Sequence, residues 1–167
     1  MPANEKVVKA FLYGADTSVF SDEGKLINLL PEPIPFGGIY VGPTGADEYV
    51  SLIQNNIRLG HLKAHEIVND NDRVIVIGSE SGHFLHNDQP YEMDWVHVNT
   101  VVDGKIIEMR EYNDTAALLQ AYNAPSPQYT RRENLDQSHT GPTRSTGLFV
   151  SHLSSPHDRR PQKKCRC

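Results

Sequence analysis

Cysteine and long apolar runs are scarce in this chain of 167 residues. The only cysteines, Cys165 and Cys167, lie near its end. Two cysteines are too few for a disulfide framework or for a structural zinc site, which needs about four ligands. We interpret them as solvated thiols on a loose tail. No apolar run approaches the roughly 18 residues of a membrane-spanning helix, so no membrane partner is expected.

Signals for export and for several common enzyme classes are also lacking. The first residues, MPANEKVVKAF, have neither the basic start nor the apolar stretch of a secretory signal, so we expect a cytoplasmic protein. No GxSxG, phosphate-binding loop or dinucleotide fingerprint is present. The segment HFLHND has two histidines and an aspartate, but turn residues follow it at the end of a predicted strand. No metal site is therefore expected.

Charge is divided unevenly along the chain. Residues 1–122 contain 8 Lys/Arg and 18 Asp/Glu, a formal charge of −10, which argues against nucleic-acid binding there. Residues 123–167 contain 8 Lys/Arg and 3 Asp/Glu, a formal charge of +5, with many Pro, Ser and Thr. We expect a single domain at 1–122 and a disordered basic tail that cannot bury enough apolar surface to fold. A contact between this tail and RNA or an anionic surface is the alternative.

The first 122 residues predict helices followed by strands. Apolar residues at helical spacing indicate a first helix within residues 4–20 and a shorter one within residues 22–30. A longer helical pattern covers residues 44–57, where Thr44 is the expected N-cap. This part of the sequence therefore predicts a helical layer.

After Gly60 the apolar period changes to two, which indicates strands. Asp103-Gly104 is a strong hairpin signal between the last two of them, and Asp114 is the expected cap of a final helix. Helices followed by long antiparallel strands predict an α+β fold, a curved antiparallel sheet with helices on its concave side. The predicted strands lie within residues 61–68, 72–86, 91–102 and 105–113.

The hairpin at residues 92–114 carries polar side chains among apolar ones. Odd-numbered residues of each strand share one face. A three-residue turn would place both odd-numbered sets on the inner face, with His97 one diagonal step from Glu111. A two-residue turn would place the sets on opposite faces. The sets are Trp95, His97, Asn99 and Val101 in one strand, and Ile107, Met109, Glu111 and Asn113 in the other.

A histidine and a glutamate that share an apolar enclosure must be hydrogen-bonded or lose charge. Burial raises the pKa of a carboxyl group, and a nearby imidazolium lowers it. His97 and Glu111 can therefore be a coupled pair poised for proton transfer near neutral pH. A satisfied structural pair is the alternative.

The segments PFGGIYVGPTGADEYVSLI and WVHV, followed by DGKIIEMREYNDT, resemble those of the SnoaL-like polyketide cyclases. These belong to the superfamily of ketosteroid isomerase and nuclear transport factor two. The resemblance covers roughly Asn4 to Tyr122. It implies a cone-shaped α+β barrel, open at one end and often dimeric through its sheet. These motifs mark the superfamily better than any one activity, because the fold carries many functions.

The resemblance also implies roles for particular residues. His97 and Glu111 fall where the cyclases have an acid–base His and Asp, so Glu111 is the expected base and His97 the acid or enolate stabiliser. Tyr13 is the candidate for a tyrosine supplied by the first helix, and Glu32 is a weaker candidate base. Tyr40 is expected to line the mouth or to pack under a helix. The expected substrate-binding residues are Trp95, Asn99, Met109, Asn113 and Tyr40.

We therefore expect a cofactor-independent enzyme, homodimeric, that removes a proton next to a carbonyl of a hydrophobic polyketide- or steroid-like molecule. Isomerisation or intramolecular aldol closure would follow. The alternative is a non-catalytic small-molecule-binding or dimerisation module of the same fold. Water addition to an epoxide, known in another branch of the superfamily, would need an Asp–Arg–Asp set in the cavity, and Arg110 lies on the other face by parity.

Overall fold

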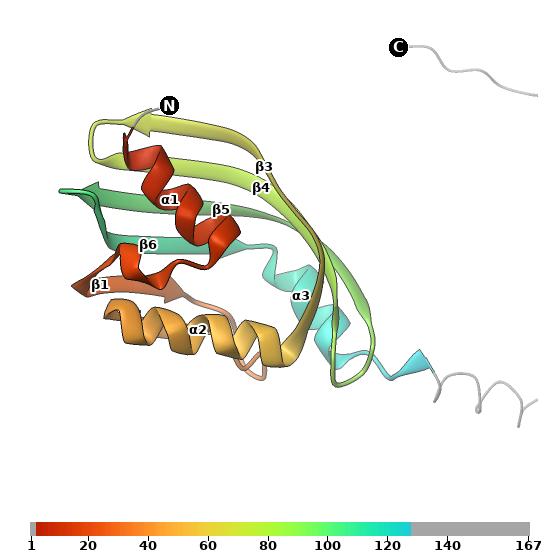
Figure 1. Cartoon of the computed structure of the whole chain (residues 1–167). Coiled ribbons are helices and arrows are strands. Elements are labelled where there is room, and N and C mark those ends of the chain that lie inside the picture. Colours follow the sequence, from red (N-terminus) through yellow and green to blue (C-terminus); the bar gives the residue numbers. More distant parts are fainter. Residues whose placement is uncertain (1–2, 128–167) are drawn as a thin grey trace, which may run out of the picture.

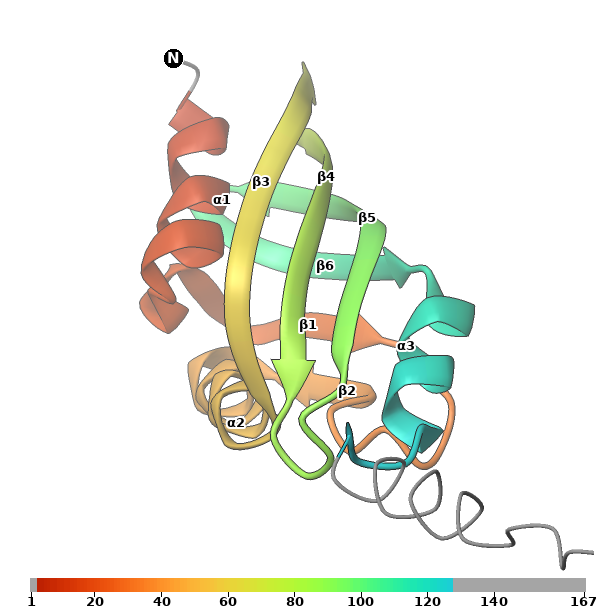
Figure 2. The ribbon, with the colours of Figure 1, turned by 90° about the vertical axis from the view of Figure 1, so that its right-hand side faces the viewer.

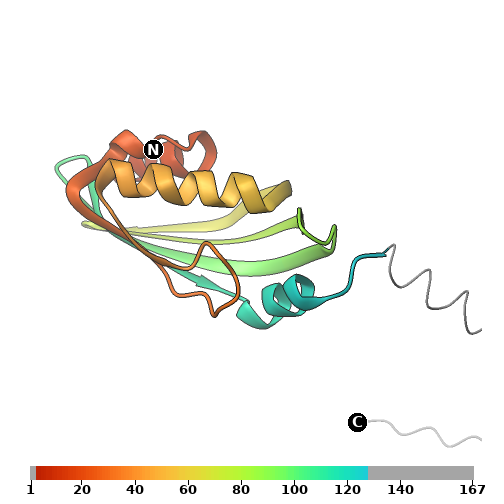
Figure 3. The same ribbon diagram turned by 90° about the horizontal axis from the view of Figure 1, so that it is seen from below.

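The computed structural model describes residues 3–127. A six-stranded sheet curves around the core, with α1 and α2 on its concave side and α3 at the far end (Figures 1, 2 and 3). The α+β class and the curved sheet predicted from the sequence are confirmed. The elements are α1 (Ala3–Gly14), the 3-10 turn η1 (Thr17–Val19), β1 (Phe20–Asn28), β2 (Gly38–Val41), α2 (Gly42–Asn56), β3 (Ile57–Asp70), β4 (Arg73–Phe84), β5 (Pro90–Val102), β6 (Lys105–Asn113) and α3 (Thr115–Asn123).

The strand order across the sheet is β2-β1-β6-β5-β4-β3. Strands β3 to β6 form the expected antiparallel meander. Strand β1 pairs with β6 in parallel, and β2 pairs with β1 in antiparallel orientation at the edge. The sheet is therefore mostly antiparallel, and an early strand lies beside the last one.

The prediction of a second helix within residues 22–30 is wrong, because most of this segment belongs to strand β1. Leu26, Ile27 and Asn28 are buried there, between β2 on one side and β6 on the other. A short apolar run fits either a helix or a strand locally. Here pairing on both edges, which is set by distant segments, decides in favour of the strand.

Helix boundaries also differ from the prediction at two places. Helix α1 ends at Gly14, and the chain turns through η1 before β1 starts at Phe20. Thr44 is not the cap of α2. Val41 occupies the N-cap position without a side-chain cap bond, and proline lies in the first turn, where its missing N–H has no cost. The predicted cap of α3 is confirmed, since the Asp114 side chain accepts a hydrogen bond from the Ala117 backbone.

The hairpin turn has two residues, and the predicted three-residue turn is wrong. Asp103 and Gly104 both have positive φ, 50° and 74°, as a type I′ turn requires. Val102 lies opposite Lys105. With a regular ladder this turn would place His97 and Glu111 on opposite faces.

A β-bulge at Ile107 restores the shared face. Val101 pairs with Ile106, whereas Thr100 pairs with Glu108, so Ile107 has no partner. The extra residue reverses the parity of the rest of β6. Glu111 therefore points inward, directly opposite His97 rather than on a diagonal. The predicted inner position of Ile107 is wrong, because it is 42% exposed while Ile106 is fully buried.

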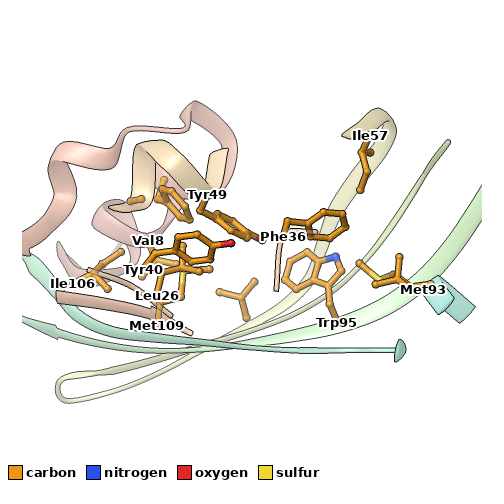
Figure 4. Packing of buried hydrophobic residues seen from close by; sticks show 14 of the residues in the cluster. Val8, Leu26, Phe36, Tyr40, Tyr49, Ile57, Met93, Trp95, Ile106 and Met109 are labelled. Atoms are coloured by element: carbon orange, nitrogen blue, oxygen red, sulfur yellow. The ribbon is translucent and has the colours of Figure 1, made fainter. Parts of the chain in front are cut away.

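The core fills the concave side of the sheet (Figure 4). Strand β5 shows how it is built, since its odd-numbered residues from Tyr91 to Val101 are buried and its even-numbered ones are more exposed. Within residues 3–127, no helix has the length and apolar character needed to cross a membrane. Most of the predicted tail, with Cys165 and Cys167, lies outside the described residues. The buried cluster includes Val8, Phe11, Leu26, Phe36, Tyr49, Trp95, Ile106, Met109 and Leu118.

Candidate active site

A cavity of about 480 Å³ lies between the concave face of the sheet and the helices. This volume is in the usual range for a small-molecule site. Figure 4 shows Phe36 beside Trp95 of the sheet, and Tyr49 beside Tyr40. The wall is mostly apolar, and its polar groups come from four strands and from α1 and α2. The apolar wall includes Phe11, Phe36, Val50, Ile53, Leu62 and Met93.

His97 and Glu111 face each other across β5 and β6, and both line the cavity. The His97 Nε2 atom is 3.9 Å from Glu111 Oε1, which is too long for a hydrogen bond. The two side chains keep 11% and 6% exposure. The pair predicted from the sequence is therefore brought together in an apolar enclosure, without a direct bond between its members.

The other carboxylate oxygen of Glu111 is held firmly. Glu111 Oε2 accepts hydrogen bonds from the Tyr49 hydroxyl and from Asn28 Nδ2, both at 2.8 Å. Asn28 lies opposite Glu111 in the parallel pairing of β1 with β6, and Asn113 Nδ2 donates to Asn28 Oδ1 at 3.0 Å. The Asn113 side chain also favours the ionised carboxylate and lowers its pKa. Tyr49 and Asn28 both donate to Oε2 and not to Oε1, so Oε1 is the oxygen left for a ligand.

Burial raises the pKa of Glu111 to about 7. The hydrogen bond from Tyr49 lowers this pKa, and the negative charge of Glu80 raises it. A carboxyl group with this pKa is partly ionised at neutral pH and is still a stronger base than an ordinary carboxylate. This is the protonation behaviour expected of a catalytic base.

Burial lowers the pKa of His97 to about 3, so its imidazole is neutral at physiological pH. The ring stacks on Trp95, with centroids 4.2 Å apart. A neutral imidazole donates from one nitrogen and accepts at the other. The imidazolium that the sequence argument considered as a partner for the carboxylate is therefore absent, and His97 acts as a neutral donor or acceptor.

A second polar pair, Glu80 and Tyr91, also lines the cavity. The Tyr91 hydroxyl donates to Glu80 Oε1 at 2.8 Å. Burial raises the pKa of Glu80, and the bond from Tyr91 lowers it. Burial and the Glu80 charge raise the pKa of Tyr91, so the tyrosine remains a donor.

The structure does not bring Tyr13 to the pair. Its side chain borders the cavity but is 56% exposed, and its hydroxyl accepts a hydrogen bond from the Ala64 backbone at 3.3 Å. Tyr49 from α2 supplies the phenol beside Glu111 instead. Tyr40 packs against Tyr49, with ring centroids 5.3 Å apart, which is the packing alternative. Glu32 is exposed.

The other predicted binding residues lie at different depths. Asn113 lines the cavity. Trp95, Asn99 and Met109 are buried in the layer beneath it, and Asn99 Nδ2 donates to the Val74 carbonyl. Within the described part of the chain, no group of three or more His, Cys, Asp or Glu is placed to hold a metal ion.

Sequence reasoning missed Asn28, Tyr49, Glu80 and Tyr91. Asn28 lies in the segment that was predicted to be helical, so its pairing with β6 was not foreseen. Tyr49 lies in the segment that was predicted as the longer helix, but nothing local indicates that its hydroxyl reaches a carboxylate. For Glu80 the available signal was its position inside a long predicted strand, at a site of the same parity as Val74 and Val76.

The fold is that of the nuclear transport factor two-like superfamily, as the resemblance predicted. A structure of such a protein from Burkholderia xenovorans LB400 superimposes with a TM-score of 0.65 at 26% identity, covering 72% of this chain and 96% of its own. A candidate SnoaL-like polyketide cyclase from Jannaschia sp. CCS1 gives 0.61 at 19%, covering 74% and 93%.

A third neighbour, TerC crystallised with polyporic acid, gives a TM-score of 0.64 at 22% identity and covers 74% of this chain and 100% of its own. No protein-family model matches the sequence, and no curated protein matches it either. Identities this low establish the shared fold, and the activity has to be argued from the site itself.

Proposed function

We propose that this protein is a cofactor-independent enzyme that removes a proton from the carbon next to a carbonyl group of a hydrophobic small molecule. The observation that carries the proposal is the state of Glu111. One oxygen is fixed by two donors, the other faces a cavity of about 480 Å³, and burial raises its pKa to about 7.

In the proposed reaction, Glu111 Oε1 takes the proton and the C–H electron pair moves to the carbonyl oxygen, giving an enolate. A neutral His97 N–H donates a hydrogen bond to that oxygen. Isomerisation follows when Glu111 returns the proton to a different carbon. Aldol cyclisation follows when the enolate carbon attacks a second carbonyl of the same molecule and the resulting alkoxide takes the proton back from Glu111. The apolar wall excludes water, which would quench the enolate.

Tyr49 and Asn28 have a positioning role in this scheme. Both donate to Oε2, so they favour the ionised carboxylate and fix the plane of its two oxygens. Without them, burial alone would push the Glu111 pKa higher and leave less base at neutral pH. TerC, which has this fold, was co-crystallized with polyporic acid, and this supports the binding of a small organic molecule here.

Exchange of α-hydrogens for deuterium in cyclic ketones tests the proposal, because it requires only the first step. NMR would follow exchange in a panel of tetralones and steroid ketones. The wild-type protein should accelerate exchange, whereas Glu111→Gln and His97→Ala should each abolish the acceleration with the fold intact. Glu92→Gln is the matched control, since Glu92 is exposed. Ligand binding without exchange would favour the non-catalytic alternative.

We also propose that the protein is a homodimer through the outer face of its sheet. This face presents Ile77 of β4 beside Val96 of β5, which in turn lies beside Tyr112 of β6. Ile77 is 38% and Tyr112 57% exposed, and contiguous exposed apolar patches mark interaction sites. Sedimentation should give twice the mass of one chain, and Ile77→Asp should give a folded monomer.

A further inference from the structure

We propose that Glu80 and Tyr91 form a second polar subsite in the cavity, which accepts a hydrogen bond from a hydroxyl or a protonated amine on the part of the ligand remote from Glu111. The inference rests on the proposed function only in taking the cavity as a small-molecule site. It concerns which molecules bind and is independent of whether they react.

The subsite is displaced along β5 from the catalytic pair. Glu80 pairs with Met93, and His97, four residues farther along β5, pairs with Glu111. At about 3.3 Å per residue, these positions are about 13 Å apart along the strand. Because the strand curves, the direct separation is shorter. A molecule of two or three fused rings can therefore contact both ends of the cavity.

Two glycines make room for this subsite. Gly78 and Gly82 flank Glu80 on the inner face of β4. A Cβ atom at Gly78 would lie 2.4 Å from Cζ2 of Trp95, and one at Gly82 would lie 3.0 Å from the Tyr91 hydroxyl. The two aromatic rings thus occupy space that side chains of β4 would otherwise fill. Glu80 is the side chain between them, and it projects into the cavity.

The chemistry of the pair selects hydrogen-bond donors. Tyr91 uses its hydroxyl proton on Glu80 Oε1, and no residue of the described part donates to Glu80 Oε2. The pair therefore offers an acceptor oxygen and no free donor. Neither Lys nor Arg borders the cavity within residues 3–127. A ligand carboxylate would share the cavity with the carboxylates of Glu80 and Glu111, and no cationic side chain would balance its charge. A ligand ammonium would instead offset the cost of burying the Glu80 charge.

The test measures binding of four 1-tetralones that differ only at position 6: hydroxy, aminomethyl, methoxy and carboxy. Isothermal titration should show that the wild-type protein binds the hydroxy and aminomethyl compounds at least about tenfold more tightly than the methoxy compound, as expected for a hydrogen bond to a charged group. The carboxy compound should bind most weakly.

Variants at Glu80 separate the two donor types. Glu80→Met should remove the preference for both the hydroxy and the aminomethyl compound over the methoxy compound. Glu80→Gln keeps an acceptor oxygen but has no charge, so it should remove only the preference for the aminomethyl compound. Glu92→Met is the control, because Glu92 is exposed on the neighbouring strand. Equal affinity of the wild type for the hydroxy and methoxy compounds, or no binding of any tetralone, would overturn the subsite whatever the variants do. Selective binding without α-hydrogen exchange would remove the proposed catalysis and leave the subsite standing.

Discussion

Asn28 and Glu111 lie opposite each other where β1 runs parallel to β6, and Asn28 Nδ2 donates to Glu111 Oε2 at 2.8 Å. The asparagine is only 2% exposed. Tyr49 donates to the same oxygen. One oxygen of the carboxylate is therefore fixed by groups from the N-terminal half of the domain, and the other is left to react. The proposed proton abstraction depends on this asymmetry.

Replacing Tyr49 with phenylalanine should make Glu111 a scarcer base at neutral pH. The tyrosine hydrogen bond favours the ionised carboxylate and lowers the pKa of Glu111. Its loss should raise that pKa by about one unit, given the usual strength of a hydrogen bond to a charge. The acidic limb of the pH–rate profile for α-hydrogen exchange should move to higher pH by the same amount. An unmoved limb would show that Tyr49 does not act through Glu111.

Replacing Glu80 with glutamine should have the opposite effect. The charge of Glu80 raises the pKa of Glu111, so removing it should lower that pKa and shift the acidic limb to lower pH. Carboxyl titration by NMR gives the same quantity without substrate. Glu92→Gln should leave the titration in place, since its side chain is exposed. A rise of the Glu111 pKa in Glu80→Gln would contradict the charge coupling.

The raised pKa of Glu111 should also be visible in stability. Folding raises the pKa of Glu111 from 4.5 to about 7. At a pH between these two values, the native state therefore holds a proton that the unfolded state has lost. The stabilisation is complete below pH 4.5 and is lost as the pH rises through about 7. The free energy of unfolding of the wild type, minus that of Glu111→Gln, should fall by up to about 3 kcal/mol across this window.

The lowered pKa of His97 has the opposite effect on the pH dependence of the free energy of unfolding. For this reason the measured quantity is the difference between the wild type and Glu111→Gln. The pKa of His97 falls from 6.5 to about 3 on folding, so the unfolded state binds the extra proton and stability rises with pH between these values. Subtracting the Glu111→Gln data removes this shared contribution. Urea unfolding at pH 5 and pH 8 suffices, and a difference that stays constant would exclude the raised pKa.

Gly78→Ala should destabilise the domain by about 1–3 kcal/mol, the usual cost of overpacking. The new methyl group would lie 2.4 Å from Cζ2 of Trp95 and 2.5 Å from the Lys63 carbonyl oxygen, and neither can move freely. Gly14→Ala is the matched control, because nothing lies within 4 Å of its Cβ position. Thermal unfolding compares the two, and equal melting temperatures would contradict the packing of Trp95 over β4.

The sequence predicted the inner position of Glu111 from an incorrect turn. Strand parity was assigned on a three-residue turn, whereas the turn has two residues and the bulge at Ile107 restores the parity. A bulge cannot be read from Ile106-Ile107, because both residues suit either face. The fold class, the long meander and the cap of α3 were predictable because each depends on local period or on turn chemistry.

The rest of the site depends on contacts between distant segments. Asn28 and Glu111 are 83 positions apart, and Tyr49 and Glu111 are 62 apart. Local patterning assigned the segment containing Asn28 to a helix, so its parallel pairing with β6 could not be foreseen. The roles of Tyr49, Glu80 and Tyr91 likewise follow from the curvature of the sheet, which brings their hydroxyl and carboxyl groups into one cavity.

The most direct measurement is the titration of the Glu111 carboxyl carbon by NMR in protein labelled with ¹³C-glutamate, with the signal assigned from Glu111→Gln. The account predicts a midpoint at about pH 7, at least two units above the exposed glutamates. A midpoint near the ordinary value of about 4.3 would contradict the account, because Glu111 would then be a weak, fully ionised group rather than a base tuned for proton abstraction.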